Sequence, residues 1–127
     1  MRALLINPAD KSVTEVVHNG DYRQIYELID CQTFACPVIF PNEDTLYCDD
    51  EGLFNPDIIG GIMMVGWSSP IVGKCLILGA DIETGESVDA VSTVEEITGQ
   101  ITKWLSAEDA RDYAMRVMET PFNIVTF

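Results

Sequence analysis

The sequence predicts a single α+β domain, residues 1–127, with a mostly antiparallel sheet of about five or six strands. Short apolar or alternating segments bounded by turn residues recur within residues 1–80, which is typical of strands. One helical stripe of apolar residues lies near the N-terminus, and two more follow near the C-terminus. A length of 127 residues with 47% hydrophobic residues fits one globular domain with a buried core.

The N-terminal end predicts two strands and a helix. Residues 3–6 are a short apolar run that ends at an Asn-Pro turn, and residues 12–17 alternate between apolar and polar side chains. We therefore expect an antiparallel pair of strands. Residues 21–30 carry apolar side chains at helical spacing, which predicts an amphipathic helix with Asp21 as its N-cap.

The middle of the chain predicts four further strands. Residues 34–40 and 45–48 are rich in β-forming residues and are joined by a polar turn, which indicates a hairpin. Acids and a glycine at residues 49–52 are expected to break the second of these strands. Residues 62–67 and 72–78 are too apolar for exposed edges, so we place both at the centre of the sheet.

Two helices are predicted near the C-terminus. Ser92 and Glu95 have the spacing of a capping box, and apolar residues follow at helical spacing as far as Leu105. Ser106 is expected to cap a second helix that Pro121 ends, with residues 122–127 docking as a final strand. Aromatic side chains on apolar stripes are expected mostly in the core: Tyr22, Tyr26, Trp67, Trp104 and Tyr113.

The four cysteines indicate neither zinc nor disulfides. They show no Cys-x-x-Cys spacing, and the single histidine, His18, is distant from all of them in sequence. The chain begins with no secretory signal, so we expect reduced, buried thiols in a cytoplasmic protein. No apolar run approaches the ~20 residues of a membrane span, so no membrane partner is expected.

Charge is the feature that bears most directly on function. The formal net charge is −14, and between Arg23 and Lys103 a single cation, Lys74, stands against fourteen Asp and Glu. Such an imbalance repels nucleic acid and anionic membranes, and it attracts cationic surfaces or metal ions. We predict that acids in the turns form a partner-binding rim: Asp44, Asp49, Asp50, Glu51, Asp57, Asp81, Glu83, Glu86 and Asp89.

Local motifs in these turns match no established metal or catalytic pattern. Residues 49–51 are consecutive acids, and on an extended strand only the first and third point to the same side. Residues 81–92 lack the spacing of a calcium-binding EF-hand loop. His18 has no nucleophile and orienting partner at a recognisable spacing, and no phosphate-binding loop occurs. We therefore expect a non-enzymatic protein without a metal or cofactor.

Three segments resemble a family of small domains of unknown function from phages, plasmids and bacterial genomes. They are MRALLINP at residues 1–8 with NGDY and IY at 19–26, YCDDEGL at 47–53, and PIVGKCLILG at 70–79. The resemblance covers roughly residues 1–86, departs from the family pattern at 57–61, and leaves the C-terminal helices outside. It implies a mobile-element setting and supplies no catalytic residues.

Two functional hypotheses follow. The first is a non-enzymatic accessory protein of a phage or plasmid that acts in the host bacterial cytoplasm. It would bind a cationic, nucleic-acid-binding surface of a host protein, as an anti-restriction or anti-CRISPR inhibitor that partly mimics DNA. The alternative is a ligand sponge that binds a small molecule, a nucleotide or a divalent metal, although Lys74 is the only central cation for an anionic ligand. A homo-oligomer is compatible with either hypothesis.

Overall fold

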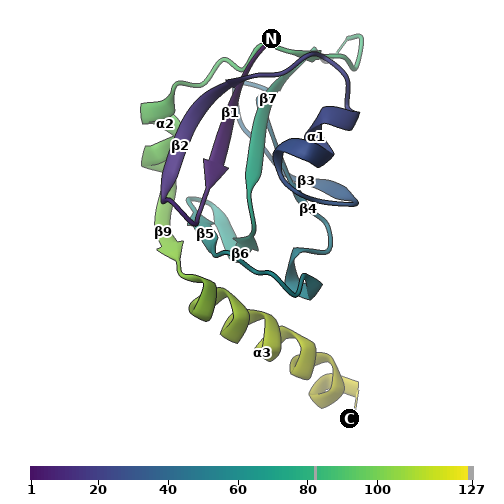
Figure 1. Cartoon of the computed structure of the whole chain (residues 1–127), viewed down its shortest axis with the longest axis vertical. Coiled ribbons are helices and arrows are strands. Elements are labelled where there is room, and N and C mark those ends of the chain that lie inside the picture. Colours follow the sequence, from purple (N-terminus) through teal and green to yellow (C-terminus); the bar gives the residue numbers. More distant parts are fainter. Residues whose placement is uncertain (82, 126–127) are drawn as a thin grey trace.

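A computed structural model describes residues 1–81 and 83–125, with side chains described only up to Val117. Its strands form two antiparallel sheets (Figure 1). The six-stranded sheet contains β1 (Arg2–Asn7), β2 (Ser12–Val17), β3 (Phe34–Ile39), β4 (Thr45–Asp49), β7 (Cys75–Ala80) and β8 (Ser87–Val88). The three-stranded sheet contains β5 (Gly61–Met64), β6 (Trp67–Val72) and β9 (Ile101–Leu105). The helices are α1 (Arg23–Leu28), α2 (Val94–Gln100) and α3 (Ala107–Val125), with a 3-10 turn, η1 (Gly52–Phe54).

The α+β class is confirmed, but the strands divide between two sheets instead of forming one. The main path of the larger sheet runs β2-β1-β7-β4-β3, with β8 paired to β7, and the smaller sheet runs β6-β5-β9. Two glycines with positive φ interrupt the apolar runs predicted at 62–67 and 72–78. Gly66, with φ of +75°, lies in the turn between β5 and β6 of the smaller sheet, and Gly73, with φ of +96°, lies where the chain passes from β6 to β7 of the larger sheet. Both runs were predicted at the centre of one sheet. The second run supplies β7, the central strand of the larger sheet, whereas the first supplies β5, the central strand of the smaller sheet.

The larger sheet is covered on both faces. Ala3 of β1 and Leu76 of β7 pack with Ile25 and Ile29 around α1. The alternate residues on the same strands, such as Ile77, face a second core shared with the three-stranded sheet and α2. Burial on both faces explains why β1 and β7 are almost uninterrupted apolar runs in the sequence.

The region predicted as the first C-terminal helix is divided between a helix and a strand. Thr93, not Ser92, caps α2, and its side chain and that of Glu96 complete the capping box. The helix ends at Gln100, and residues 101–105 continue as β9, which pairs with β5. The helical spacing of Ile101, Trp104 and Leu105 was therefore misleading, because pairing with β5 overrides the local periodicity.

Helix α3 begins as predicted but runs further. Ser106 Oγ accepts a hydrogen bond from Asp109 N at 3.1 Å, which confirms the predicted cap. The helix continues through Pro121 to Val125, so the predicted stop is wrong. A proline removes one backbone hydrogen bond from a helix without necessarily ending it. Residues 122–125 are thus helical where a strand was predicted, and residues 126–127 lie outside the described residues.

Among the other local predictions, some are confirmed and some are wrong. Helix α1 is present, but Tyr22 occupies the N-cap position, and Asp21 instead accepts hydrogen bonds from the backbone and side chain of Arg23. Tyr22 is 61% exposed and Trp67 is 37% exposed, so neither is the core residue that the sequence predicted. Aromatic packing does occur where Tyr26, Phe34 and Tyr47 meet, with adjacent ring centroids 5.1 Å and 5.4 Å apart.

A buried carboxylate joins the β3–β4 hairpin to the segment before α2. Asp44 is fully buried, and its oxygens accept hydrogen bonds from Val91 N at 3.0 Å and Ser92 N at 2.8 Å. Asn42 adds a bond from its Nδ2 to Ser92 Oγ at 2.8 Å. Asp44 was predicted to belong to an exposed rim. That placement is wrong, because the carboxylate is buried and accepts hydrogen bonds from backbone amides inside the fold.

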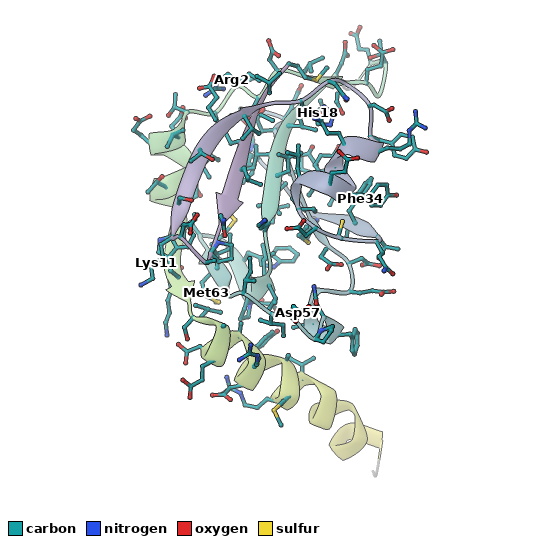
Figure 2. The ribbon with its side chains drawn as sticks, in the orientation of Figure 1. Arg2, Lys11, His18, Phe34, Asp57 and Met63 are labelled. Carbon is teal, nitrogen blue, oxygen red and sulfur yellow. The ribbon has the colours of Figure 1, made fainter. Side chains whose placement is uncertain are left out.

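His18 is the second buried polar residue of note, and it lies near the end of the molecule that carries Arg2, away from Asp57 (Figure 2). Its Nδ1 accepts a hydrogen bond from Gly20 N at 3.0 Å, so the neutral ring carries its proton on Nε2. Among the described residues that Nε2 has no partner. Desolvation and the nearby N-terminal ammonium lower the pKa of His18, and Asp21 opposes them.

We expect Asp44→Asn to lower the free energy of unfolding by about 1–3 kcal/mol, because the hydrogen bonds lose the charge of their acceptor and a buried NH2 group replaces one carboxylate oxygen. Urea denaturation measures this difference. The matched control is Glu43→Gln, which makes the same chemical change at the exposed neighbouring residue and should stay within about 0.5 kcal/mol of the parent. Equal losses for the two variants would contradict the role given to Asp44.

The lowered pKa of His18 predicts that stability falls on mild acidification. Below the ordinary histidine value of 6.5 the unfolded chain takes up a proton that the folded chain resists. The free energy of unfolding should therefore decrease as the pH falls from about 7.5 to about 5, above the range where most carboxylates titrate. His18→Asn keeps an acceptor for Gly20 N and should show a smaller decrease in urea titrations. An unchanged pH dependence would rule out His18 as its source.

Candidate functional site: two acidic surfaces

The predicted rim divides into two groups at opposite ends of a strand pair. Cys48 pairs with Cys75 at one end of the β4–β7 ladder, and Thr45 pairs with Leu78 at the other. The first group, here called the β4–η1 acidic group, consists of Asp49, Asp50, Glu51 and Asp57. The second, the β7–β8 acidic group, consists of Asp81, Glu83, Glu86 and Asp89. At ~3.3 Å per residue, the length of β7 separates the two groups by roughly 20 Å.

The β4–η1 acidic group is held by local hydrogen bonds. Asp49 Oδ1 accepts from Glu51 N at 2.9 Å, which turns the chain sharply at the end of β4. Asn55 Oδ1 accepts from Asp57 N at 2.9 Å on the other side of η1. Asp50, Glu51 and Asp57 are exposed, whereas Asp49 is partly buried. Short side chain-to-backbone bonds of this kind fix the carboxylates on a rigid turn.

Asp30 joins this group from a distant part of the sequence. It follows α1 in the left-handed conformation, with φ of +53°, and its Oδ2 accepts a bond from Lys74 Nζ at 2.6 Å. Asp30, Asp49, Asp57 and Lys74 line one pocket of about 330 Å³. Three carboxylates therefore line the pocket with one lysine, and that lysine is already paired with Asp30. The sequence offered no signal for this pairing, because the two partners are 44 residues apart.

Three members of the β7–β8 acidic group, Asp81, Glu83 and Glu86, lie on the turn between β7 and β8, and Asp89 follows β8. Asp81 Oδ1 accepts from Glu83 N at 3.0 Å, and Asp81 N donates to Glu86 O at 2.9 Å, which closes the loop. Asp89 is less free, since its Oδ1 accepts a 2.7 Å bond from Arg2 N. Glu83 and Glu86 are exposed. The second group thus combines these two exposed glutamates with Asp81, which holds the turn, and Asp89, which bonds to β1.

The thiols are poorly suited to nucleophilic chemistry. All four cysteines are free, and Cys48 and Cys75 are buried as expected, whereas Cys36 is exposed. Burial raises the pKa of Cys31 to about 11 and that of Cys48 to about 12, with nearby acids adding to both effects. At neutral pH these groups remain thiols, which are weak nucleophiles and weak metal ligands.

Neither a metal cluster nor a membrane helix emerges from the described part of the chain. Within residues 1–81 and 83–117, no three histidine, cysteine or acidic side chains are placed to hold a metal ion. In the same residues, no helix combines the length and apolarity needed to cross a bilayer.

Together the fold and these surfaces define an acidic α+β domain whose charged turns flank a central strand pair. A family model described as Domain of unknown function (DUF3846) matches residues 1–103, so the protein belongs to this family. The match extends past the expected limit at residue 86 and includes α2, which leaves α3 outside. Comparison with curated proteins finds no match, and comparison with solved structures finds none either.

Clustering of like charges predicts a salt-dependent stability. Raising NaCl from 0.05 to 0.5 M should increase the free energy of unfolding by on the order of 1 kcal/mol, because screening weakens repulsion between exposed carboxylates. The group variant, with Asp49→Asn, Asp50→Asn, Glu51→Gln and Asp57→Asn, should gain less from salt. Urea denaturation at the two salt concentrations checks this.

The control is a dispersed variant that loses the same number of charges at separate exposed positions: Asp10→Asn, Glu27→Gln, Glu95→Gln and Asp112→Asn. It should retain more of the salt dependence than the group variant, since isolated charges repel each other less. If the two variants respond equally to salt, net charge rather than local clustering governs the effect.

Proposed function

We propose that this protein is a non-enzymatic accessory protein of a phage or plasmid that binds a cationic surface of a host bacterial protein. The partner surface is one that ordinarily binds nucleic acid, and the complex forms in the host cytoplasm. Blocking such a surface would make the protein an anti-defence inhibitor, directed at restriction or RNA-guided immunity, that acts as a partial DNA mimic. The observation that carries this proposal is the β4–η1 acidic group, joined by Asp30.

Electrostatics favours this reading of the group. A duplex presents one negative charge per ~1.7 Å of its axis, and proteins that bind it carry basic clefts suited to that field. Here Asp30, Asp49 and Asp57 line a single pocket, with Asp50 and Glu51 on the adjoining turn. Lys74, the only lysine in the pocket, is neutralised by Asp30. The remaining carboxylates present a field that attracts a cationic partner and repels nucleic acid.

The spacing of the two acidic groups adds to the proposal. Roughly 20 Å along β7 corresponds to about six base-pair steps at ~3.4 Å each, so one basic cleft is long enough to contact both groups. Both lie on turns fixed by hydrogen bonds at the ends of central strands. These hydrogen bonds favour the proposal, because carboxylates that are already held in place reduce the ordering cost of association.

The mobile-element setting rests on the motif resemblance, since the family itself carries no function. The alternative function, a ligand sponge, has weaker support. Lys74 is committed to Asp30, so an anionic nucleotide would meet mainly carboxylates in the pocket that contains it. No arrangement of ligands for a divalent cation occurs within the described residues.

Capture from bacterial lysate tests the proposed function. The immobilised protein should retain a host protein at 50 mM NaCl and release most of it at 500 mM, because screening weakens contacts between exposed charges. The group variant should retain at least about ten-fold less, equivalent to a loss of about 1.4 kcal/mol of binding free energy. A 20-base-pair duplex added in excess should compete for the captured protein.

The dispersed variant serves as the matched control, because it has the same net charge as the group variant. It should retain the host protein within about three-fold of the parent if local charge density drives binding. Equal loss by both variants, or capture that neither salt nor duplex DNA reduces, would count against a DNA-mimicking surface.

A further inference from the structure

A groove lies between one edge of each sheet. β3 is the last strand on the path of the larger sheet, and β6 is the last strand of the smaller one; neither pairs with a further strand within the described residues. An open hollow of about 270 Å³ lies between them. Ala35 and Pro37 line it from β3, and Trp67, Ser69 and Pro70 line it from β6. Two strand edges thus border one cavity.

The walls of this groove are largely apolar. Leu53 of η1 and Tyr113 of α3 also line it, and the Trp67 side chain remains 37% exposed. Ser69 and Pro70 are successive residues, which point to opposite sides of a strand, so the backbone edge of β6 itself borders the groove. An unpaired strand edge beside exposed apolar side chains is a template for pairing with another strand.

Prolines restrict where such pairing can occur. Pro37 on β3 and Pro70 on β6 have no backbone N–H, so neither can donate to an added strand. The available part of β6 is therefore its first half, residues 67–69, which is exposed along its whole length. Trp67 lies within this half and offers an apolar contact for an incoming side chain.

Charge determines the chemistry of the occupant. Asp49 and Asp50 line the groove, and its lining includes neither lysine nor arginine. A second copy of the chain is a poor occupant, because each copy carries a net charge of −14. A segment with apolar side chains directed at Trp67 and cationic side chains directed at the two aspartates satisfies both features of the groove.

We infer that the groove binds an extended segment of a partner protein in which apolar residues alternate with lysine or arginine, added as a strand to the free edge of β6. Alternation follows from strand geometry, since successive side chains point in opposite directions. The inference rests on the proposed function for the cationic character of the partner. It adds that part of the recognition comes from backbone hydrogen bonds and apolar contact.

Fluorescence anisotropy with two labelled peptides tests the inference on the full chain. One eight-residue peptide alternates lysine and valine, and the other has the same composition with four lysines followed by four valines. At 150 mM NaCl the alternating peptide should bind at least about ten-fold more tightly. N-methylation of one alternate set of its amides should weaken binding about ten-fold, whereas methylation of the other set should change it less than about three-fold.

Trp67→Ala should weaken the alternating peptide by about five-fold or more, with circular dichroism confirming that the variant is folded. If the Trp67→Ala variant does not fold, the methylated peptides still test the inference, because they require no change in the protein. Absence of binding by either peptide, or insensitivity to methylation and to Trp67→Ala, would overturn the inference.

The outcomes also separate this inference from the proposed function. Equal binding of both peptides that the group variant abolishes would leave the electrostatic function standing and remove the groove from it. Concentration-dependent dimerisation that the alternating peptide reverses would overturn the inference in favour of a second copy as occupant. If the group variant reduces capture of the host protein and Trp67→Ala does not, the electrostatic function stands and the inference about the groove is overturned.

Discussion

The structure depends on the burial of one strand, β7, from both sides. Its side chains alternate between a core under α1 and a core shared with the smaller sheet, so neither layer can form without it. Because β1 and β4 pair with its two edges, β7 also fixes the register of the larger sheet. The acidic turns lie at its two ends. The strongest apolar constraint in the molecule therefore sets the distance between its most charged surfaces.

Local sequence signals predicted the elements well where they depended on neighbours along the chain. The β1–β2 and β3–β4 hairpins, α1 and the Ser106 cap were all predictable, because turn residues and apolar spacing act over a few positions. Residues 101–105 were misassigned because pairing with β5 decides their conformation, and β5 is about forty residues away. The division into two sheets was likewise missed, because it depends on which strands pair across the fold, and a linear pattern of apolar residues does not contain that pairing.

On the candidate surface too, the sequence predicted what depends on local structure and missed what depends on distant contacts. Acids in turns were expected to be exposed, and Asp50, Glu51, Asp57, Glu83 and Glu86 are. Asp44 is instead buried against the backbone before α2, and Asp30 joins the β4–η1 acidic group through its pair with Lys74. Both differences come from contacts that span more than forty residues. Composition predicted the amount of charge, whereas the fold decides where it is concentrated.

Helix α3 lies beyond the family domain and is attached by a narrow contact. Ala110 and Ala114 pack on Ile58 and Val72, and the rest of the helix projects away from the two sheets (Figure 1). Neither sheet relies on it for a paired strand. Its sequence can therefore change without altering the strand pairing that holds the acidic turns. Since Tyr113 forms one wall of the β3–β6 groove, such changes would retune which segments fit there while the electrostatic surface stays constant.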